Sequence, residues 1–91
     1  MPSTLDDEEV DRRVPDGWER ENDEIVRVYE FDDYLDAASF LNNLAKIAEE
    51  EYHHPEMTLR WGEVEVRFTT HDAGGITEKD SRLADYCNDE Y

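Results

Sequence analysis

Residues 57–68 read MTLRWGEVEVRF, and this stretch decides the fold of the 91-residue chain. Apolar side chains alternate with polar ones on both sides of Gly62. A period of two is typical of a strand with one packed face and one wet face, and a glycine between two such runs is typical of a hairpin turn. The stretch therefore predicts an antiparallel β-hairpin.

Two more elements are expected before the hairpin. Residues 25–31, IVRVYEF, are rich in β-branched and aromatic residues and predict a strand. Residues 37–48 place apolar side chains at three- and four-residue intervals, which predicts an amphipathic helix. Asp32 or Asp33 can cap the start of this helix, which must end before Pro55.

A last helix is expected after the hairpin. Gly74 and Gly75 mark a break, and Thr77 with Asp80 three residues later resembles a capping box. The order strand, helix, strand, strand, helix predicts an α+β fold in which helices pack on one face of an antiparallel sheet. A chain of 91 residues has room for a single small domain.

The beginning of the chain is charged and carries little apolar content. We expect residues 1–14 to form a loose or weakly helical arm, followed by a turn at 15–17. Residues 15–91 then form the folded domain. A domain of this size buries only about 60–65% of the surface of its unfolded chain, which favours association with copies of itself. We therefore expect a homo-oligomer, either a dimer or a tetramer.

The chain is strongly acidic, with 26 acidic and 9 basic residues and a formal net charge of −17. Phosphates repel such a protein, so we expect no binding to nucleic acid or to membranes. The carboxylates are spread along the chain, which disfavours an acidic tail, and 37% hydrophobic residues in periodic runs disfavour disorder. We favour adaptation to a very salty cytosol, where a carboxylate-rich, halophilic surface keeps a protein hydrated.

The sequence also predicts a cytoplasmic location. Cys87 is the only cysteine, so no intramolecular disulfide can form and a reducing compartment is expected. No run of 18 apolar residues is present to span a membrane, and residues 1–14 are too acidic for a signal peptide. Cys87 falls in the last expected helix, where a small apolar residue would serve equally well, so we expect no nucleophilic role for it.

The three histidines of the chain flank the hairpin. His53 lies nine residues before Gly62, and His71 lies nine residues after it. Antiparallel pairing brings the start of one strand beside the end of the next, so His53 and His54 should converge with His71. Because imidazole titrates near neutral pH, such a cluster can supply a general acid and a general base together.

Neighbouring polar residues can complete a site, and other interpretations stay open. Glu49 lies one helical turn before His53 and can reach an imidazole. Residues 69–72 leave the sheet at the same end and offer hydroxyls and backbone groups to a polar ring. Adjacent histidines before a proline also occur in plain polar loops. A metal could bind His53, His71 and a carboxylate, although no HxH or HExxH spacing supports coordination.

The residues around the histidines resemble the hallmark of the pterin-4a-carbinolamine dehydratase family, also known as the dimerisation cofactor of a homeodomain transcription factor. This hallmark is Glu-x-x-x-His-His-Pro, a spacer of about fifteen residues, and then Thr-His-x-x-x-Gly-[Leu/Ile]-[Ser/Thr]-x-x-Asp. Two linked motifs at the right separation make the resemblance specific, and it spans about Trp18 to Ala84. The matching positions are Glu49, His53, His54, Pro55, Thr70, His71, Gly75, Ile76, Thr77 and Asp80.

The resemblance implies a hydro-lyase, 4a-hydroxytetrahydrobiopterin dehydratase. Such an enzyme expels the 4a-hydroxyl group of a 4a-hydroxytetrahydropterin as water and yields a quinonoid dihydropterin, with no metal and no cofactor. A non-catalytic pterin-binding or protein-dimerisation module is the alternative. The resemblance assigns catalysis to His53, His54 and His71, pterin contacts to these histidines and to Tyr52, Thr69, Thr70 and Asp72, and supporting roles to Glu49, Pro55 and Asp80.

Four positions depart from the family's common pattern. Tyr52 stands where an acidic residue is frequent, which alters one expected pterin contact. Met57 and Trp61 stand where tryptophan and tyrosine are common, and Gly62 replaces a frequent asparagine in the turn. None of these departures involves a histidine.

Overall fold

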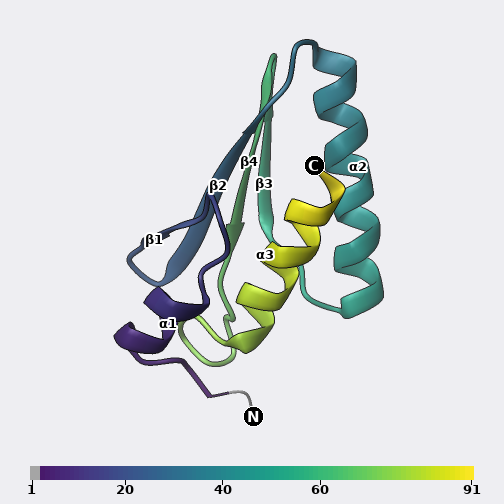
Figure 1. Cartoon of the computed structure of the whole chain (residues 1–91). Helices are drawn as coiled ribbons and strands as arrows, with labels where there is room; N and C mark the ends of the chain where they lie inside the picture. Colours follow the sequence, from purple (N-terminus) through teal and green to yellow (C-terminus); the bar gives the residue numbers. More distant parts are fainter. Residues whose placement is uncertain (1–2) are drawn as a thin grey trace.

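The computed structural model describes residues 3–91, whose helices and strands are shown in Figure 1. The expected order of strand, helix, strand, strand and helix is confirmed, and a short helix and a short strand precede it. The elements are α1 (Asp7–Arg13), β1 (Glu19–Glu21), β2 (Glu24–Glu30), α2 (Tyr34–Glu51), β3 (Glu56–Arg60), β4 (Glu63–Phe68) and α3 (Glu78–Glu90).

The four strands form one antiparallel sheet in the order β1-β2-β4-β3. Strands β3 and β4 are the expected hairpin. Arg60 pairs with Glu63, so the turn consists of two residues, Trp61 and Gly62. Trp61 therefore lies outside the strand alternation, and its side chain is 71% exposed.

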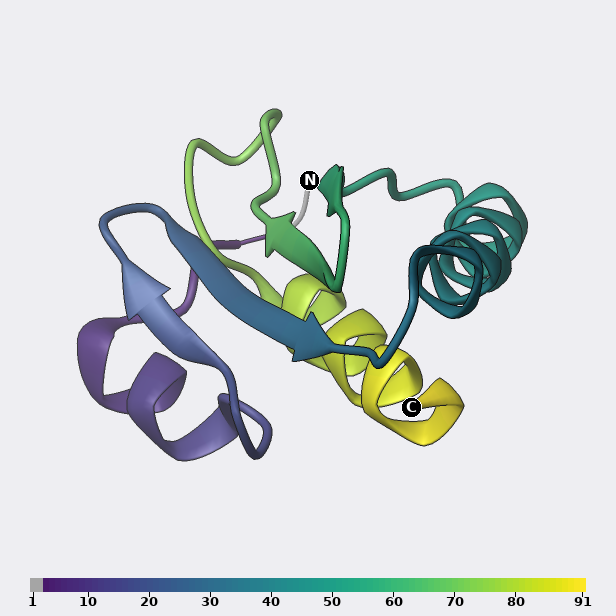
Figure 2. The same cartoon turned by 90° about the horizontal axis from the view of Figure 1, so that it is seen from above.

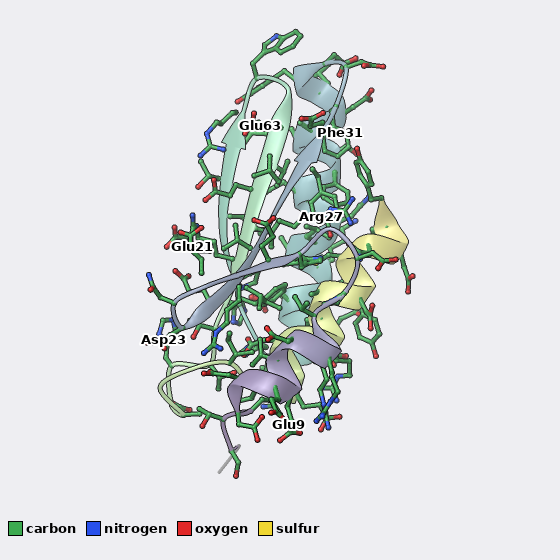
Figure 3. The ribbon with its side chains drawn as sticks, turned by 60° about the vertical axis from the view of Figure 1, so that its left-hand side comes forward. Glu9, Glu21, Asp23, Arg27, Phe31 and Glu63 are labelled. Atoms are coloured by element: carbon green, nitrogen blue, oxygen red, sulfur yellow. The ribbon has the colours of Figure 1, made fainter. Side chains whose placement is uncertain are left out.

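The alternation in β4 gives the sheet one packed face. Val64, Val66 and Phe68 are buried, whereas the charged residues between them point to the opposite face. Burying each of these apolar side chains contributes about 1.5–3 kcal/mol. Helices α2 and α3 lie side by side on the packed face (Figure 2), which confirms the expected α+β fold. Glu21 and Glu63 lie on the side of the sheet away from α2 (Figure 3).

Helix α2 forms where the apolar spacing predicts it. Its N-cap is Asp33, whose carboxylate accepts a hydrogen bond from the backbone N–H of Asp36 at 2.8 Å. This bond satisfies one of the backbone donors that the first turn leaves free. Phe40 and Leu44, one turn apart, are buried in the core between the helix and the sheet.

Tyr52 ends α2 in the left-handed region, with a φ of 52°. This conformation costs a non-glycine residue about 1–2 kcal/mol. The backbone N–H groups of Tyr52 and His53 donate to the carbonyls of Glu49 at 3.4 Å and Ala48 at 3.1 Å, which closes the helix end. The chain turns at this point toward β3, and His53 and His54 are the first residues of the connection.

The N-terminal arm was expected to be loose or weakly helical. Its residues 1 and 2 lie outside the described part of the chain, and residues 7–13 are helical, but the described segment is not loose. Helix α1 starts at the N-cap Asp6, and its Val10 is buried in the core. The backbone N–H of Leu5 donates to the carbonyl of Ile76 at 2.8 Å. One inward valine in a two-turn helix is enough to dock this segment, but it is too little apolar periodicity to recognise in the sequence.

Strand β1 was not predicted from the sequence. Its residues Glu19–Glu21 are all charged and exposed, so they show no alternation of apolar and polar side chains. They join the sheet through backbone pairing with β2. No helix within residues 3–91 is long and apolar enough to cross a membrane.

Candidate active site

Two connections of the chain meet at one end of the sheet, where α2 leads into β3 and β4 leads into α3 (Figure 1). They border a polar cleft of about 270 Å³. All the residues from which pterin contacts are expected line this cleft, together with Lys79, which was not predicted. The lining consists of Tyr52, His53, His54, Thr69, Thr70, His71, Asp72 and Lys79.

The best-held histidine is His53. Its Nε2 lies 2.5 Å from Oδ1 of Asp80, whose side chain is completely buried. The second oxygen of Asp80 accepts hydrogen bonds from the hydroxyl of Thr70 and from the backbone N–H of Thr77, both at 2.8 Å. The ring also stacks on Phe68, with ring centres 5.9 Å apart and planes 6° from parallel. The orientation of the imidazole is therefore fixed from two sides.

The contact with Asp80 also determines what His53 offers to the cleft. A carboxylate accepts hydrogen bonds, so the His53 nitrogen that faces it, Nε2, carries a proton. The other nitrogen, Nδ1, has no hydrogen bond to residues 3–91, and no buried polar side-chain atom of this part of the chain lacks a partner. Nδ1 is therefore accessible to water, and in the neutral ring it is a proton acceptor.

His54 is held more loosely than His53. Its Nε2 lies 3.1 Å from Oε1 of Glu49, so Glu49 reaches an imidazole, as predicted. Both side chains are largely exposed, at 59% and 75%. An ion pair so open to water contributes about 0–1 kcal/mol. The imidazole of His54 is therefore in direct contact with solvent.

His71 lies on a tight loop after β4. The backbone N–H of Thr70 donates to the carbonyl of Gly75 at 2.9 Å, and the carbonyl of Thr70 accepts from Gly74 at 3.0 Å. Gly74 has a φ of 77°, which a residue with a side chain adopts only with strain. This closed loop carries the exposed His71 to the rim of the cleft.

The register of the hairpin differs by one residue from the register that we predicted from the sequence. The symmetric arms were centred on Gly62, whereas the turn contains two residues. At this register, the position across from His53 falls on Thr70, and Thr70 shares the carboxylate of Asp80 with His53. His71 lies one residue further along, and it still lines the cleft.

Two further features bear on the chemistry of the chain, namely the grouping of metal-binding side chains and the state of Cys87. Within residues 3–91, no three histidine, cysteine, aspartate or glutamate side chains are grouped so that they could hold a metal ion. Burial, and to a lesser degree the charge of Glu90, raises the pKa of the Cys87 thiol to about 12. The thiol is therefore protonated at neutral pH, which makes it a poor nucleophile.

The sequence did not reveal the link between His53 and Asp80. Asp80 accepts the backbone N–H of Thr77, as the capping box predicts. Because the cap already accounts for an acidic residue at this position, nothing in the spacing indicates a second partner 27 residues earlier. Lys79 lies in the first turn of the same helix and belongs to no motif.

Fold and cleft together define a small α+β protein in which three histidines line a polar cleft. Residues 3–90 match the family described as "Pterin 4 alpha carbinolamine dehydratase", and the chain belongs to this family. It is 62% identical to a protein of Haloarcula marismortui over 97% of this chain and 96% of that one. It is 53% identical to a protein of Natronomonas pharaonis over 93% and 92% of the two chains. Both relatives are named "Putative pterin-4-alpha-carbinolamine dehydratase".

The solved structures that are similar to this one include two with informative names. A "transcriptional coactivator/pterin dehydratase" from Brucella melitensis has a TM-score of 0.91 and 30% identity, and the match covers 97% of this chain and 98% of that chain. A "pterin dehydratase-like protein" described as a RuBisCO assembly factor in the alpha-carboxysome has a TM-score of 0.65 and covers 80% and 84%. At 19% identity, the second likeness concerns the fold alone.

Proposed function

We propose that this protein is a hydro-lyase that dehydrates a 4a-hydroxytetrahydropterin with histidines as acid and base. One observation carries the proposal: His53, held by the buried Asp80, shares a cleft with His54 and His71. A general acid or base must keep its orientation and its tautomer during proton transfer, and a buried carboxylate provides both. The family of the chain and the names of its relatives support the same reaction.

In the proposed reaction, the bond between carbon 4a and its hydroxyl oxygen breaks. A ring nitrogen gives its proton to the base, and the electron pair of that N–H bond forms the new C=N bond of the quinonoid product. The hydroxyl group takes a proton from the acid and leaves as water. The base and the acid then exchange protons with solvent, which returns both to their starting states.

The surroundings of each histidine suggest how the work is divided. Nδ1 of His53 suits the base, because the negative charge of Asp80 stabilises the imidazolium that forms. His54 and His71 are exposed, so either can regain a proton from water and act as the acid.

Thr69 is suited to hold the pterin ring through its oxygen lone pairs. Its hydroxyl proton is donated to the carbonyl of Asp23 at 2.7 Å, so the oxygen has only acceptor capacity left. A pterin ring carries N–H groups that need acceptors. Tyr52 and Asp72 would provide further contacts from the two sides of the cleft.

The test is a measurement of 4a-hydroxytetrahydropterin dehydration by the purified protein, followed by absorbance in high salt. The protein should accelerate the reaction, and His53→Ala should lose at least about 10²-fold of the rate, as expected for one acid–base group. If the folded protein gave the same rate as buffer, the proposal would be wrong.

The non-catalytic alternative stays a prediction to be tested with the same reagents. A pterin-binding or dimerisation module would bind a stable pterin, or a second protein, without turnover. The expected homo-oligomer, cytoplasmic location and halophilic surface also stay predictions. Light scattering would give the number of chains in the assembly.

A further inference from the structure

A second cavity adjoins the histidine cleft. It has a volume of about 420 Å³ and lies between the segment before α1 and the first turns of α3. Lys79 lines both this cavity and the cleft, so the two hollows share a wall. One apolar residue, Leu5, lines this cavity together with two residues that carry hydroxyl groups and four charged residues. These are Ser3, Thr77, Arg13, Glu78, Lys79 and Arg82.

The charge of this cavity is opposite to that of the protein. The chain has 9 basic and 26 acidic residues, yet three of the basic ones, Arg13, Lys79 and Arg82, line the cavity, and Glu78 is the one acidic residue there. If the basic residues were distributed at random over the surface, a third of them would not be expected to line a single cavity beside the candidate site. An anion approaching this protein meets repulsion over most of its surface and attraction here.

The cations of the cavity are also weakly engaged. Lys79 forms no ion pair within residues 3–91. The nearest carboxylate of Arg13 is Glu9 at 3.4 Å, and that of Arg82 is Glu51 at 3.6 Å, with both guanidinium groups nearly half exposed. Such pairs contribute little, so a ligand can replace them at small cost.

The arginines of the sheet provide the contrast. Arg67 donates to Glu65 at 2.6 Å and to Glu21 at 3.0 Å, and Arg60 donates to Glu63 at 2.8 Å and to Glu65 at 3.0 Å. The hydrogen bonds from Arg67 and Arg60 lower the pKa of Glu65. Each of these guanidinium groups makes two hydrogen bonds of 2.6–3.0 Å to carboxylates, whereas the carboxylates nearest to Arg13 and Arg82 lie at 3.4 Å and 3.6 Å.

We propose that the second cavity binds an anionic group, a phosphate ester or a carboxylate, at the end of the ring substituent of the pterin in the cleft. This inference rests on the proposed function and specifies its substrate class. Guanidinium groups pair with phosphate and carboxylate through parallel hydrogen bonds, and a lysine adds a mobile point charge. Lys79, on the shared wall, would meet the substituent first, and Arg82 and Arg13 would hold its anionic end.

The competing explanation is that these cations only offset nearby carboxylates such as Glu9, Glu51 and Glu78. In that case their removal would change stability slightly and would affect all pterins equally. A comparison of charged and uncharged substrates separates the two explanations.

The experiment measures kcat and KM for three 4a-hydroxytetrahydropterins, whose side chains carry a neutral dihydroxypropyl group, a phosphate ester or a glutamyl carboxylate. Arg82→Gln should raise KM for one or both anionic substrates about tenfold, the usual effect of losing one charge-assisted hydrogen bond, and leave the neutral substrate unchanged. Lys79→Gln should raise KM more for the anionic than for the neutral substrate. Lys46→Gln removes the same charge at an exposed position of α2 that lines neither hollow, and it serves as the control.

The outcomes distinguish the two proposals. A KM increase confined to the phosphate ester or to the glutamyl substrate would identify which anion the cavity holds. Equal changes in Arg82→Gln, Lys79→Gln and Lys46→Gln, or equal KM values for all three substrates, would overturn the inference and leave the dehydratase intact. If the folded wild-type protein turned over none of the three, the proposed function and the inference would both be wrong.

Discussion

Nε2 of His53 lies 2.5 Å from Oδ1 of Asp80, although 27 residues separate the two in the chain. The contact joins the connection after α2 to the first turn of α3. The other oxygen of Asp80 is held by Thr70 and Thr77. One buried carboxylate therefore positions an imidazole of the cleft and starts the helix behind it.

Asp80→Asn should lower kcat by about 10²-fold or more, because the neutral amide no longer stabilises a charged His53. The pH profile of kcat/KM should change as well, which a purely structural role would not cause. Asp85→Asn removes the same charge from an exposed position of α3 and should leave both unchanged. A folded Asp80→Asn protein with wild-type activity and an unaltered pH profile would contradict this role.

His54→Ala and Glu49→Gln should differ widely in their effects. Removing the imidazole of His54 should lower the rate by at least about 10²-fold. The 3.1 Å pair with Glu49 is exposed, so its loss should change the rate by less than about fivefold, which corresponds to 1 kcal/mol. Steady-state kinetics on both variants checks the contrast, and similar losses would show that Glu49 does more than assist.

Val10→Ala should destabilise the protein by about 2 kcal/mol, since it removes two buried methyl groups and leaves a small cavity. Val28→Ala, on a side chain that is 42% exposed, should cost much less. Urea unfolding of both variants measures the difference. Equal stabilities would mean that α1 is not docked on the core in solution.

Cys87 should resist thiol reagents while the protein is folded. With a pKa of about 12 instead of 9.0, its thiolate population is lower by about 10³-fold, and the side chain is also buried. A disulfide reagent at pH 8 should therefore label the protein only after unfolding in guanidinium. Rapid labelling of the folded protein would contradict the burial.

The same thiol predicts a pH dependence of stability. Between pH 9 and about 12, the unfolded chain releases the Cys87 proton while the native protein retains it, so the free energy of unfolding falls as the pH rises. Below this range Cys87 has no effect. Cys87→Ala should show a smaller decrease across the same range in denaturant unfolding, because the other titrating groups are common to both proteins.

Salt should stabilise this protein, because its carboxylates repel one another. Raising KCl from about 0.1 M to 1 M shortens the Debye length from about 10 Å to 3 Å, and each kcal/mol of repulsion relieved should raise the unfolding temperature by about 4–8 °C. A variant with Glu19→Gln, Glu50→Gln and Asp89→Asn loses three exposed charges without breaking an ion pair, and its unfolding temperature should depend less on salt. An unfolding temperature independent of KCl would rule out this role for the charge.

Local patterns predicted most of the fold. The alternation in residues 57–68 indicates the hairpin, and the spacing in residues 37–48 indicates α2, because each pattern repeats often enough to identify a packed face. The short elements α1 and β1 contain one buried residue between them, Val10, so no pattern can form.

The sequence allowed us to predict which side chains lie near one another at the site. It did not allow us to predict which hydrogen bonds they form. Antiparallel pairing brings His53 and His71 together in any hairpin of this length. Which side chain holds His53 depends on how α3 docks, and Asp80 already had a sufficient local explanation as a helix cap. The one-residue difference in register follows from the two-residue turn at Trp61 and Gly62.

If Asp80 has the proposed double role, the rate of the proposed reaction reports on tertiary assembly. During synthesis His53 leaves the ribosome before Asp80, and the hairpin between them can pair while the imidazole is still unrestrained. Its orientation is set only when α3 docks against the sheet. In a refolding experiment, enzyme turnover should therefore recover with the slowest step of helix docking, after the backbone circular dichroism of the sheet has already returned.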